Sequence, residues 1–171
     1  MNAINAFYPD HKPIVVIGHS MGGMIARALL TDSGETIWDS FFDSPPEKSE
    51  LSPKVREIVK SALIFNHRPE ISRVIFASAC LRGADMATSF TGRLGASIIA
   101  APAALSEVGR ELARLSKARA DGKRLTRLPN SIDALDPDNR FVTTINTIPL
   151  AKGIPYHSII ADRGKGGNKD H

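Results

Sequence analysis

A short apolar run at residues 14–17 passes directly into the glycine-rich sequence GHSMGG at residues 18–23, and a second apolar stretch follows at residues 24–30. The first run consists of isoleucine and valine and predicts a buried strand, whereas the second predicts a helix. Glycines two positions before and two positions after a serine are typical of a sharp strand-to-helix turn. The chain is therefore expected to reverse its direction tightly at Ser20.

The glycines of this turn have predicted structural roles. A Cβ atom at Gly18 or at Gly22 is expected to clash, because residues on the two sides of so tight a turn lie close together. Gly23 is expected to let the new helix pack closely on the neighbouring strand. His19 flanks the serine, and we expect it to be a packed, hydrogen-bonded neighbour that cannot reach round to act as a base.

The serine at the centre of such a turn is a candidate nucleophile. Its backbone is expected to be strained and held only by the packing around it. Ser20 would also stand at a helix N-terminus, where unpaired amides and the helix dipole favour negative charge. The amide of Met21, the next residue, is the predicted first donor to an oxyanion. A glycine-rich phosphate loop is the alternative, but neither of its usual glycine patterns is present.

The sequence GHSMGG behind PIVVI resembles the lipase and esterase-like members of the α/β-hydrolase superfamily. The likeness extends along the chain, because residues 71–77 look like the next parallel strand and residues 156–162 like the one after it. Residues 78–85 resemble the T-P-H-x-G-S turn of that family, although they keep mainly Arg82 and Gly83. The resemblance implies an α/β fold with a parallel sheet flanked by helices, as a partial α/β-hydrolase core with a helical cap-like insertion.

The resemblance also implies a catalytic triad in the chain order serine, acid, histidine. Ser20 takes the place of the nucleophile. Candidates for the other two members are Asp162 and Asp170 as acids, and His157 and His171 as bases. His157 begins a predicted strand whose far end is Asp162, so about 16 Å separates them at about 3.3 Å per residue. Asp162 with His171, joined by a glycine-rich tail, is the pair that geometry allows.

We expect residues 1–171 to form one partial hydrolase domain, shortened at both ends, with residues 86–150 as a helical insertion. The early strands and the final triad segment of the family are not evident in the sequence. The insertion forms either a cap over the nucleophile or a helical layer on the sheet. The sequence thus predicts a serine hydrolase of the carboxylesterase or lipase type. The alternative is a catalytically incomplete fragment, or a binding module with the same fold.

Further helices are predicted outside the turn. Their ranges are 5–8 as the tail of a helix, then 35–42, 53–65, 103–119 and 139–146. The range 35–42 carries aromatic residues at helical spacing, which indicates a core or dimer contact, or else a wall of an acyl pocket. Ser52 and Pro53 are typical of a capped helix start. His67 is expected to be a surface residue in the loop before a strand.

Composition narrows the classes of partner. The chain has 22 Lys and Arg against 18 Asp and Glu, a net charge of +4. A basic cluster lies within residues 114–127, but without aromatic interleaving it indicates a solvated surface, and no nucleic-acid partner is expected. The histidines are scattered, so no metal site or cofactor is expected. The expected substrate is a small-molecule or lipid-like ester.

The remaining expectations concern redox state, location and assembly. Cys80 is the one cysteine, which excludes an internal disulfide, and it is more typical of a small buried residue than of a catalytic thiol. Neither an integral membrane segment nor a signal peptide is evident, which favours a cytoplasmic location. Missing edge strands would expose sheet edges, so homo-oligomer formation through these edges is also expected.

Overall fold

The structure is a computed structural model that describes residues 1–83, 103–117 and 136–160. Its sheet contains three parallel strands in the order β1 (Ile14–His19), β2 (Ile71–Ala77) and β3 (Tyr156–Ile159). The carboxyl ends of parallel strands meet at one edge of a sheet. The last residues of β1 and β2 pair with each other, and the last residues of β2 and β3 do so as well. The predicted parallel strands are confirmed.

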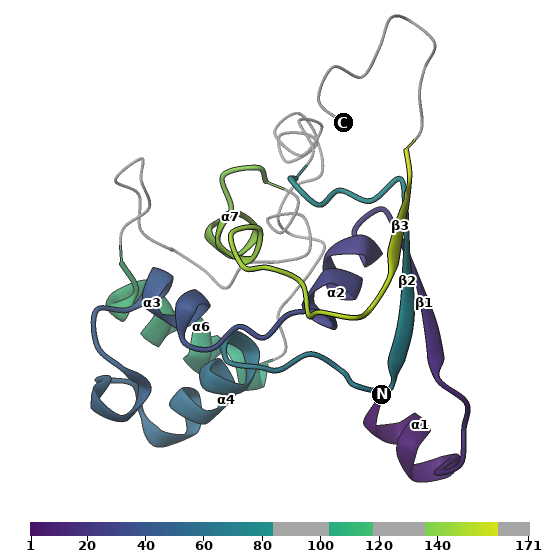
Figure 1. Cartoon of the computed structure of the whole chain (residues 1–171). Helices are drawn as coiled ribbons and strands as arrows, with labels where there is room; N and C mark the ends of the chain where they lie inside the picture. Colours follow the sequence, from purple (N-terminus) through teal and green to yellow (C-terminus); the bar gives the residue numbers. More distant parts are fainter. Residues whose placement is uncertain (84–102, 118–135, 161–171) are drawn as a thin grey trace, which may run out of the picture.

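Helices occupy about half of the other described residues (Figure 1). They are α1 (Asn2–Phe7), α2 (Gly22–Ala28), α3 (Thr36–Phe41), the 3-10 helix η1 (Pro46–Lys48), α4 (Pro53–Leu63), α6 (Ala103–Leu115) and α7 (Arg140–Ile145). Each predicted helix in the described residues is present, with ends that differ by a few residues. The expected helix tail at residues 5–8 is the end of α1.

Helix α2 lies between the sheet and helices α3, α4, α6 and α7, and it takes part in two apolar cores (Figure 1). Its Ala26 belongs to a core with Val74 and Phe76 of β2. Its Met24 belongs to a second core, formed with residues of α3, α4, α6 and α7. The helix that follows Ser20 is thus fixed from both sides.

The aromatic residues of α3 lie in the second core, as one of the sequence interpretations predicted. Ile37 and Trp38 are completely buried, and the Trp38 ring centroid lies 4.5 Å from that of Phe42. The indole N–H of Trp38 donates a hydrogen bond of 2.8 Å to the carbonyl of Ser44. The one polar atom of the buried ring therefore keeps a hydrogen-bond partner.

Two helix starts show different capping. Asn139 accepts hydrogen bonds from the amides of Phe141 and Val142 at the start of α7. Ser52 stands at the start of α4 but makes no such bond, so the predicted side-chain cap is wrong. Its hydroxyl and its amide instead donate to the carboxylate of Glu111 at 2.7 and 2.8 Å. The carboxylate of α6 is a stronger acceptor than water and ties α4 to α6.

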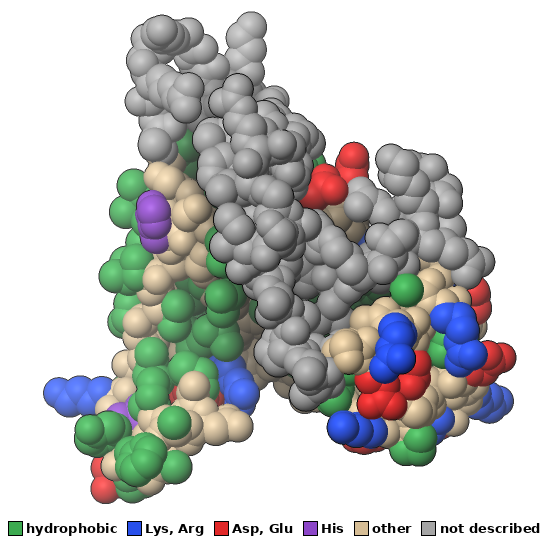
Figure 2. All heavy atoms as spheres, turned by 180° about the vertical axis from the view of Figure 1, so that it is seen from behind, with side chains coloured by type: hydrophobic (Ala, Val, Ile, Leu, Met, Phe, Trp, Pro, Cys, Tyr) green, Lys and Arg blue, Asp and Glu red, His purple; other side chains and the backbone are tan. Residues whose placement is uncertain are grey.

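The prediction that β1 is buried is also wrong. Val15 and Ile17 are 52% and 67% exposed, and Ile159 on β3 is 61% exposed. The reason is that α2 packs against one face of the sheet, while in the described residues no helix packs against the other. Figure 2 shows hydrophobic side chains gathered over the part of the molecule that holds the sheet.

The architecture is a parallel sheet flanked by helices, consistent with part of an α/β-hydrolase-like fold. Helices α6 and α7 fall within the predicted insertion at 86–150, whereas 84–102 and 118–135 lie outside the described residues. Across the described ranges, we find no helix with the length and apolar character needed to cross a membrane.

Candidate functional site

Ser20 directly follows β1 and is separated from α2 by Met21 alone, and its φ angle is +52°. Residues other than glycine rarely adopt this left-handed conformation, which costs on the order of 1–3 kcal/mol unless the surroundings hold it. Its amide donates to the carbonyl of Ala77 at 3.2 Å. Its carbonyl accepts from the amides of Gly23 at 3.0 Å and Cys80 at 3.2 Å. Backbone hydrogen bonds from α2, from the last residue of β2 and from the loop after β2 thus hold the turn.

Two of the three glycines make this turn sterically feasible. A Cβ atom on Gly18 would lie 2.7 Å from the carbonyl oxygen of Gly22 and 2.8 Å from the Cα of Gly23. A Cβ atom on Gly23 would lie 2.2 Å from the Cβ of Ala79. The expected clash at Gly18 and the expected close packing at Gly23 are therefore confirmed.

The expected clash at Gly22 is wrong. A Cβ atom built at this glycine, the first residue of α2, has no neighbour within 4 Å. The carbonyl of Gly22, rather than its Cα, approaches Gly18. The steric demand of the turn therefore lies at Gly18 and Gly23.

Met21 has helical backbone angles and precedes the first residue of α2. The amides of Gly23 and Met24 donate to the carbonyls of Ser20 and Met21, at 3.0 Å each. Within residues 1–83, 103–117 and 136–160, the amide of Met21 itself has no hydrogen-bond acceptor. An amide of this kind, next to a partly buried hydroxyl, is available to a ligand oxygen.

Cys80 borders the Ser20 side chain. The Ser20 hydroxyl oxygen lies 4.0 Å from the Cys80 sulfur, and the thiol is partly buried. Sulfur is a weak hydrogen-bonding group, so at this distance the contact is mainly one of packing. The expectation of a small buried residue at a strand end is therefore wrong, because Cys80 is only partly buried and lies in the loop three residues after the end of β2. Its contact with Ser20 was not predicted from the sequence.

A second serine with a left-handed backbone follows β2. Ser78 has a φ angle of +44°, and its amide donates to the carbonyl of Ile159 at 2.8 Å. It follows β2 directly, as Ser20 follows β1. The sequence carried no glycine pattern that could have revealed this second turn.

The proposed acid and base lie outside the described part of the chain. Asp162 and His171 both belong to residues 161–171. Of the described histidines, His19 is exposed at the end of β1, so the expected packing of its side chain is wrong. His67 contacts Asp32 at 2.8 Å on the surface, as predicted. His157 lies on β3, where Nη1 of Arg73 donates to its ring. Within the described residues no histidine or carboxylate bonds to the Ser20 hydroxyl.

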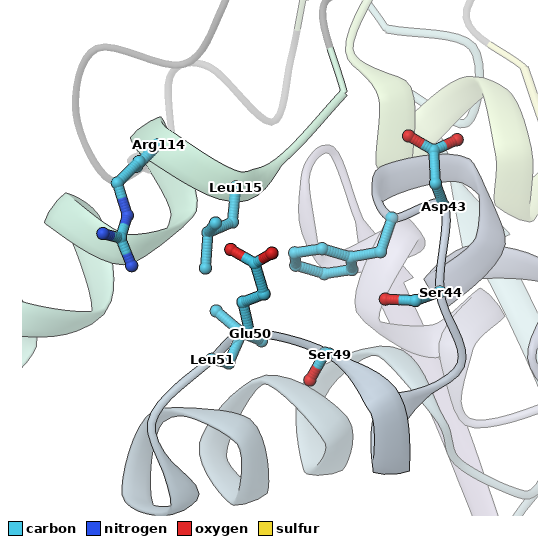
Figure 3. A pocket seen from close by; sticks show the side chains of 8 residues that line it. Asp43, Ser44, Ser49, Glu50, Leu51, Arg114 and Leu115 are labelled. Atoms are coloured by element: carbon cyan, nitrogen blue, oxygen red, sulfur yellow. The ribbon is translucent and has the colours of Figure 1, made fainter.

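A shallow pocket of about 210 Å³ lies in the helical part of the molecule (Figure 3). Phe42, Leu51 and Leu115 contribute apolar side chains to it, and Asp43, Glu50 and Arg114 contribute charged ones. Asp43 also pairs with Lys117 at 3.1 Å. None of the lining residues belongs to the turn at Ser20, so this pocket is not an extension of that site.

Comparison with known proteins gives a limited likeness. Residues 1–40 match the model of a family described as PGAP1-like alpha/beta domain. The match covers α1, β1, the turn at Ser20, α2 and most of α3, and it is short relative to the chain. It supports a hydrolase-like fold. Neither the curated proteins nor the solved structures gave a match.

Proposed function

We propose that this chain is a serine hydrolase of the carboxylesterase or lipase type, in which Ser20 is the nucleophile. The observation that carries the proposal is the left-handed backbone of Ser20 at a strand-to-helix turn. A nucleophile elbow holds its serine in this way, so that the hydroxyl stands clear of the sheet. The substrate class is a small-molecule or lipid-like ester, and the chemistry calls for no cofactor.

The Met21 amide, which has no acceptor among the described residues, supports the role of an oxyanion donor. When the Ser20 hydroxyl attacks an ester carbonyl, negative charge develops on the carbonyl oxygen. The Met21 amide, next to the nucleophile and at the start of α2, would donate to this oxygen. A histidine would take the hydroxyl proton and return it to the leaving alcohol, and a carboxylate would orient that histidine. His171 and Asp162 are the proposed pair.

The alternative is a binding or interaction module that has the fold but lacks turnover. One observation favours it: in the described residues the side-chain group within hydrogen-bonding range of the Ser20 hydroxyl is the weakly polar thiol of Cys80, not a base. A serine without a base is a poor nucleophile. The two functions therefore differ in whether the Ser20 hydroxyl is activated.

Hydrolysis of p-nitrophenyl butyrate by the 171-residue chain tests the proposal. We expect measurable turnover that falls on the order of a thousandfold or more in Ser20→Ala, since removal of a nucleophile removes the covalent path. Ser78→Ala is the matched control, because it deletes a second serine hydroxyl with a similar φ angle. It should keep wild-type turnover. Turnover that is absent, or that survives in Ser20→Ala, would favour the binding module.

A further inference from the structure

The loop at residues 78–83 forms one wall of the space around Ser20. Its Cys80 amide donates to the Ser20 carbonyl, and the Cys80 sulfur lies 4.0 Å from the Ser20 hydroxyl oxygen. Any displacement of this loop would change the space beside the hydroxyl. The contacts that fix this loop therefore affect the surroundings of the Ser20 hydroxyl.

Beyond Cys80 the loop is fixed from a distant part of the sequence. The side-chain amide of Asn146 donates a hydrogen bond of 2.6 Å to the carbonyl of Leu81. In the part of the chain that the structure describes, residues 81–83 also make a local hydrogen bond, from the Gly83 amide to the Cys80 carbonyl. In the described part of the chain, Asn146 thus supplies the long-range hydrogen bond to this end of the loop.

Asn146 is itself held in place. The same amide nitrogen also donates to the carbonyl of Val142 within α7 at 2.9 Å. On either side of Asn146, the carbonyls of Ile145 and Ile148 both accept from Nη2 of Arg27 at 2.9 Å. Arg27 belongs to α2, the helix that begins just after Ser20 (Figure 1). The contacts therefore close a ring from Ser20 through α2, α7 and the loop back to Ser20.

We propose that Asn146 is a positioning residue, which fixes the loop at residues 78–83 and thereby the wall that Cys80 forms beside the Ser20 hydroxyl. Its effect on turnover rests on the proposed function. A nucleophile works only within a narrow range of positions, and a displacement of about 1 Å is costly to the rate. Loss of the Asn146 amide should loosen the loop without removing any group that would touch substrate.

The test compares Asn146→Asp with the wild-type chain. This change keeps the shape of the side chain but replaces the amide donor with a carboxylate that repels the Leu81 carbonyl. The readout is the rate at which iodoacetamide alkylates Cys80, measured by mass spectrometry under native conditions. Loss of the hydrogen bond to the Leu81 carbonyl should raise the alkylation rate about fivefold. The kcat for p-nitrophenyl butyrate should fall by a similar factor, with KM little changed.

Thr147→Ala is the matched control, since the Thr147 hydroxyl donates to Thr144 at the same end of α7 and not to the loop. It should show wild-type alkylation and turnover. Should Asn146→Asp fail to fold, Asn146→Ala removes the donor without adding charge and takes its place. Thermal unfolding midpoints, expected to stay within a few degrees of wild type, separate local loosening from a global loss of stability.

The alkylation readout does not depend on catalysis, so the two proposals can fail separately. Faster alkylation in a chain without turnover would reject the hydrolase and keep the role of Asn146 in holding the loop. Equal alkylation rates in wild type and Asn146→Asp would overturn that role, whatever the turnover. Faster alkylation with unchanged kcat in an active chain would overturn the positioning of Ser20.

Discussion

Helix α2 approaches the residue that follows Ser78 so closely that a Cβ atom on Gly23 would lie 2.2 Å from the Cβ of Ala79. This contact joins the helix after the first strand to the loop after the second. It is the tightest of the glycine contacts in the turn at Ser20, since the shortest at Gly18 is 2.7 Å. The geometry of the turn thus depends on missing Cβ atoms.

The first prediction concerns these glycines. Gly18→Ala and Gly23→Ala should each lower the free energy of unfolding by about 1–3 kcal/mol, because the added methyl group overpacks the turn. Gly22→Ala is the matched control and should be neutral or stabilising by up to about 1 kcal/mol, because its Cβ meets open space and alanine favours a helix. Urea denaturation measures all three. A Gly22→Ala chain as unstable as Gly18→Ala would contradict this account.

The second prediction concerns the contact between α2 and α7. Burial lowers the pKa of the Arg27 guanidinium, which still stays charged, and among the described residues its Nε has no hydrogen-bond partner. Arg27→Met should lower the free energy of unfolding by about 2 kcal/mol, because two buried carbonyls lose a charged donor. Lys60→Met is the control, since Lys60 pairs with Glu47 on the surface, and it should cause little change. Equal stability of the two variants would refute a structural role for Arg27.

The third prediction concerns pH. Hydrogen bonds from the hydroxyl and the amide of Ser52 lower the pKa of Glu111 below its ordinary value of 4.5. A carboxylate with a lowered pKa stabilises the fold above its ordinary pKa, and this contribution is lost as the pH falls through the lower value. Unfolding by urea, measured from about pH 6 down to about pH 3, should therefore be more pH-dependent in wild type than in Glu111→Gln. Parallel curves would contradict the prediction.

The fourth prediction concerns the exposed side of the sheet. Ile17 on β1 and Ile159 on β3 are more than half exposed, and apolar side chains of this kind favour association. Self-association through the sheet edges stays a prediction, and this exposed face is a further surface through which we expect the chain to associate. Ile17→Lys should shift the sedimentation coefficient toward that of a monomer while the free energy of unfolding changes by less than about 0.5 kcal/mol. A wild-type chain that is monomeric at all concentrations would exclude such association.

Local patterns in the sequence predicted much of this fold. The glycine-flanked serine between two apolar runs located the turn at Ser20, because strand, turn and helix signals are all local there. Residues 71–77 were predicted as a strand and form β2 over the same range. The helix at residues 53–65 was also predicted, and α4 ends two residues earlier.

Features that depend on distant residues could not be predicted. Nothing near Ser52 indicates that its hydroxyl donates to Glu111, 59 residues away, instead of capping α4. The exposure of Ile17 depends on which side of the sheet α2 covers, and an apolar run cannot show this. The hydrogen bond from Asn146 to Leu81 spans 65 residues and requires α7 to be placed first.

The most direct test of the central claim is the reaction of the chain with a fluorophosphonate, followed by peptide mass spectrometry. An activated serine reacts with this phosphorus centre, whereas an ordinary serine does not. We predict a single adduct on Ser20, retained in Ser78→Ala and absent from Ser20→Ala. No adduct at Ser20, or an adduct that persists in Ser20→Ala, would contradict the assignment of Ser20 as a nucleophile.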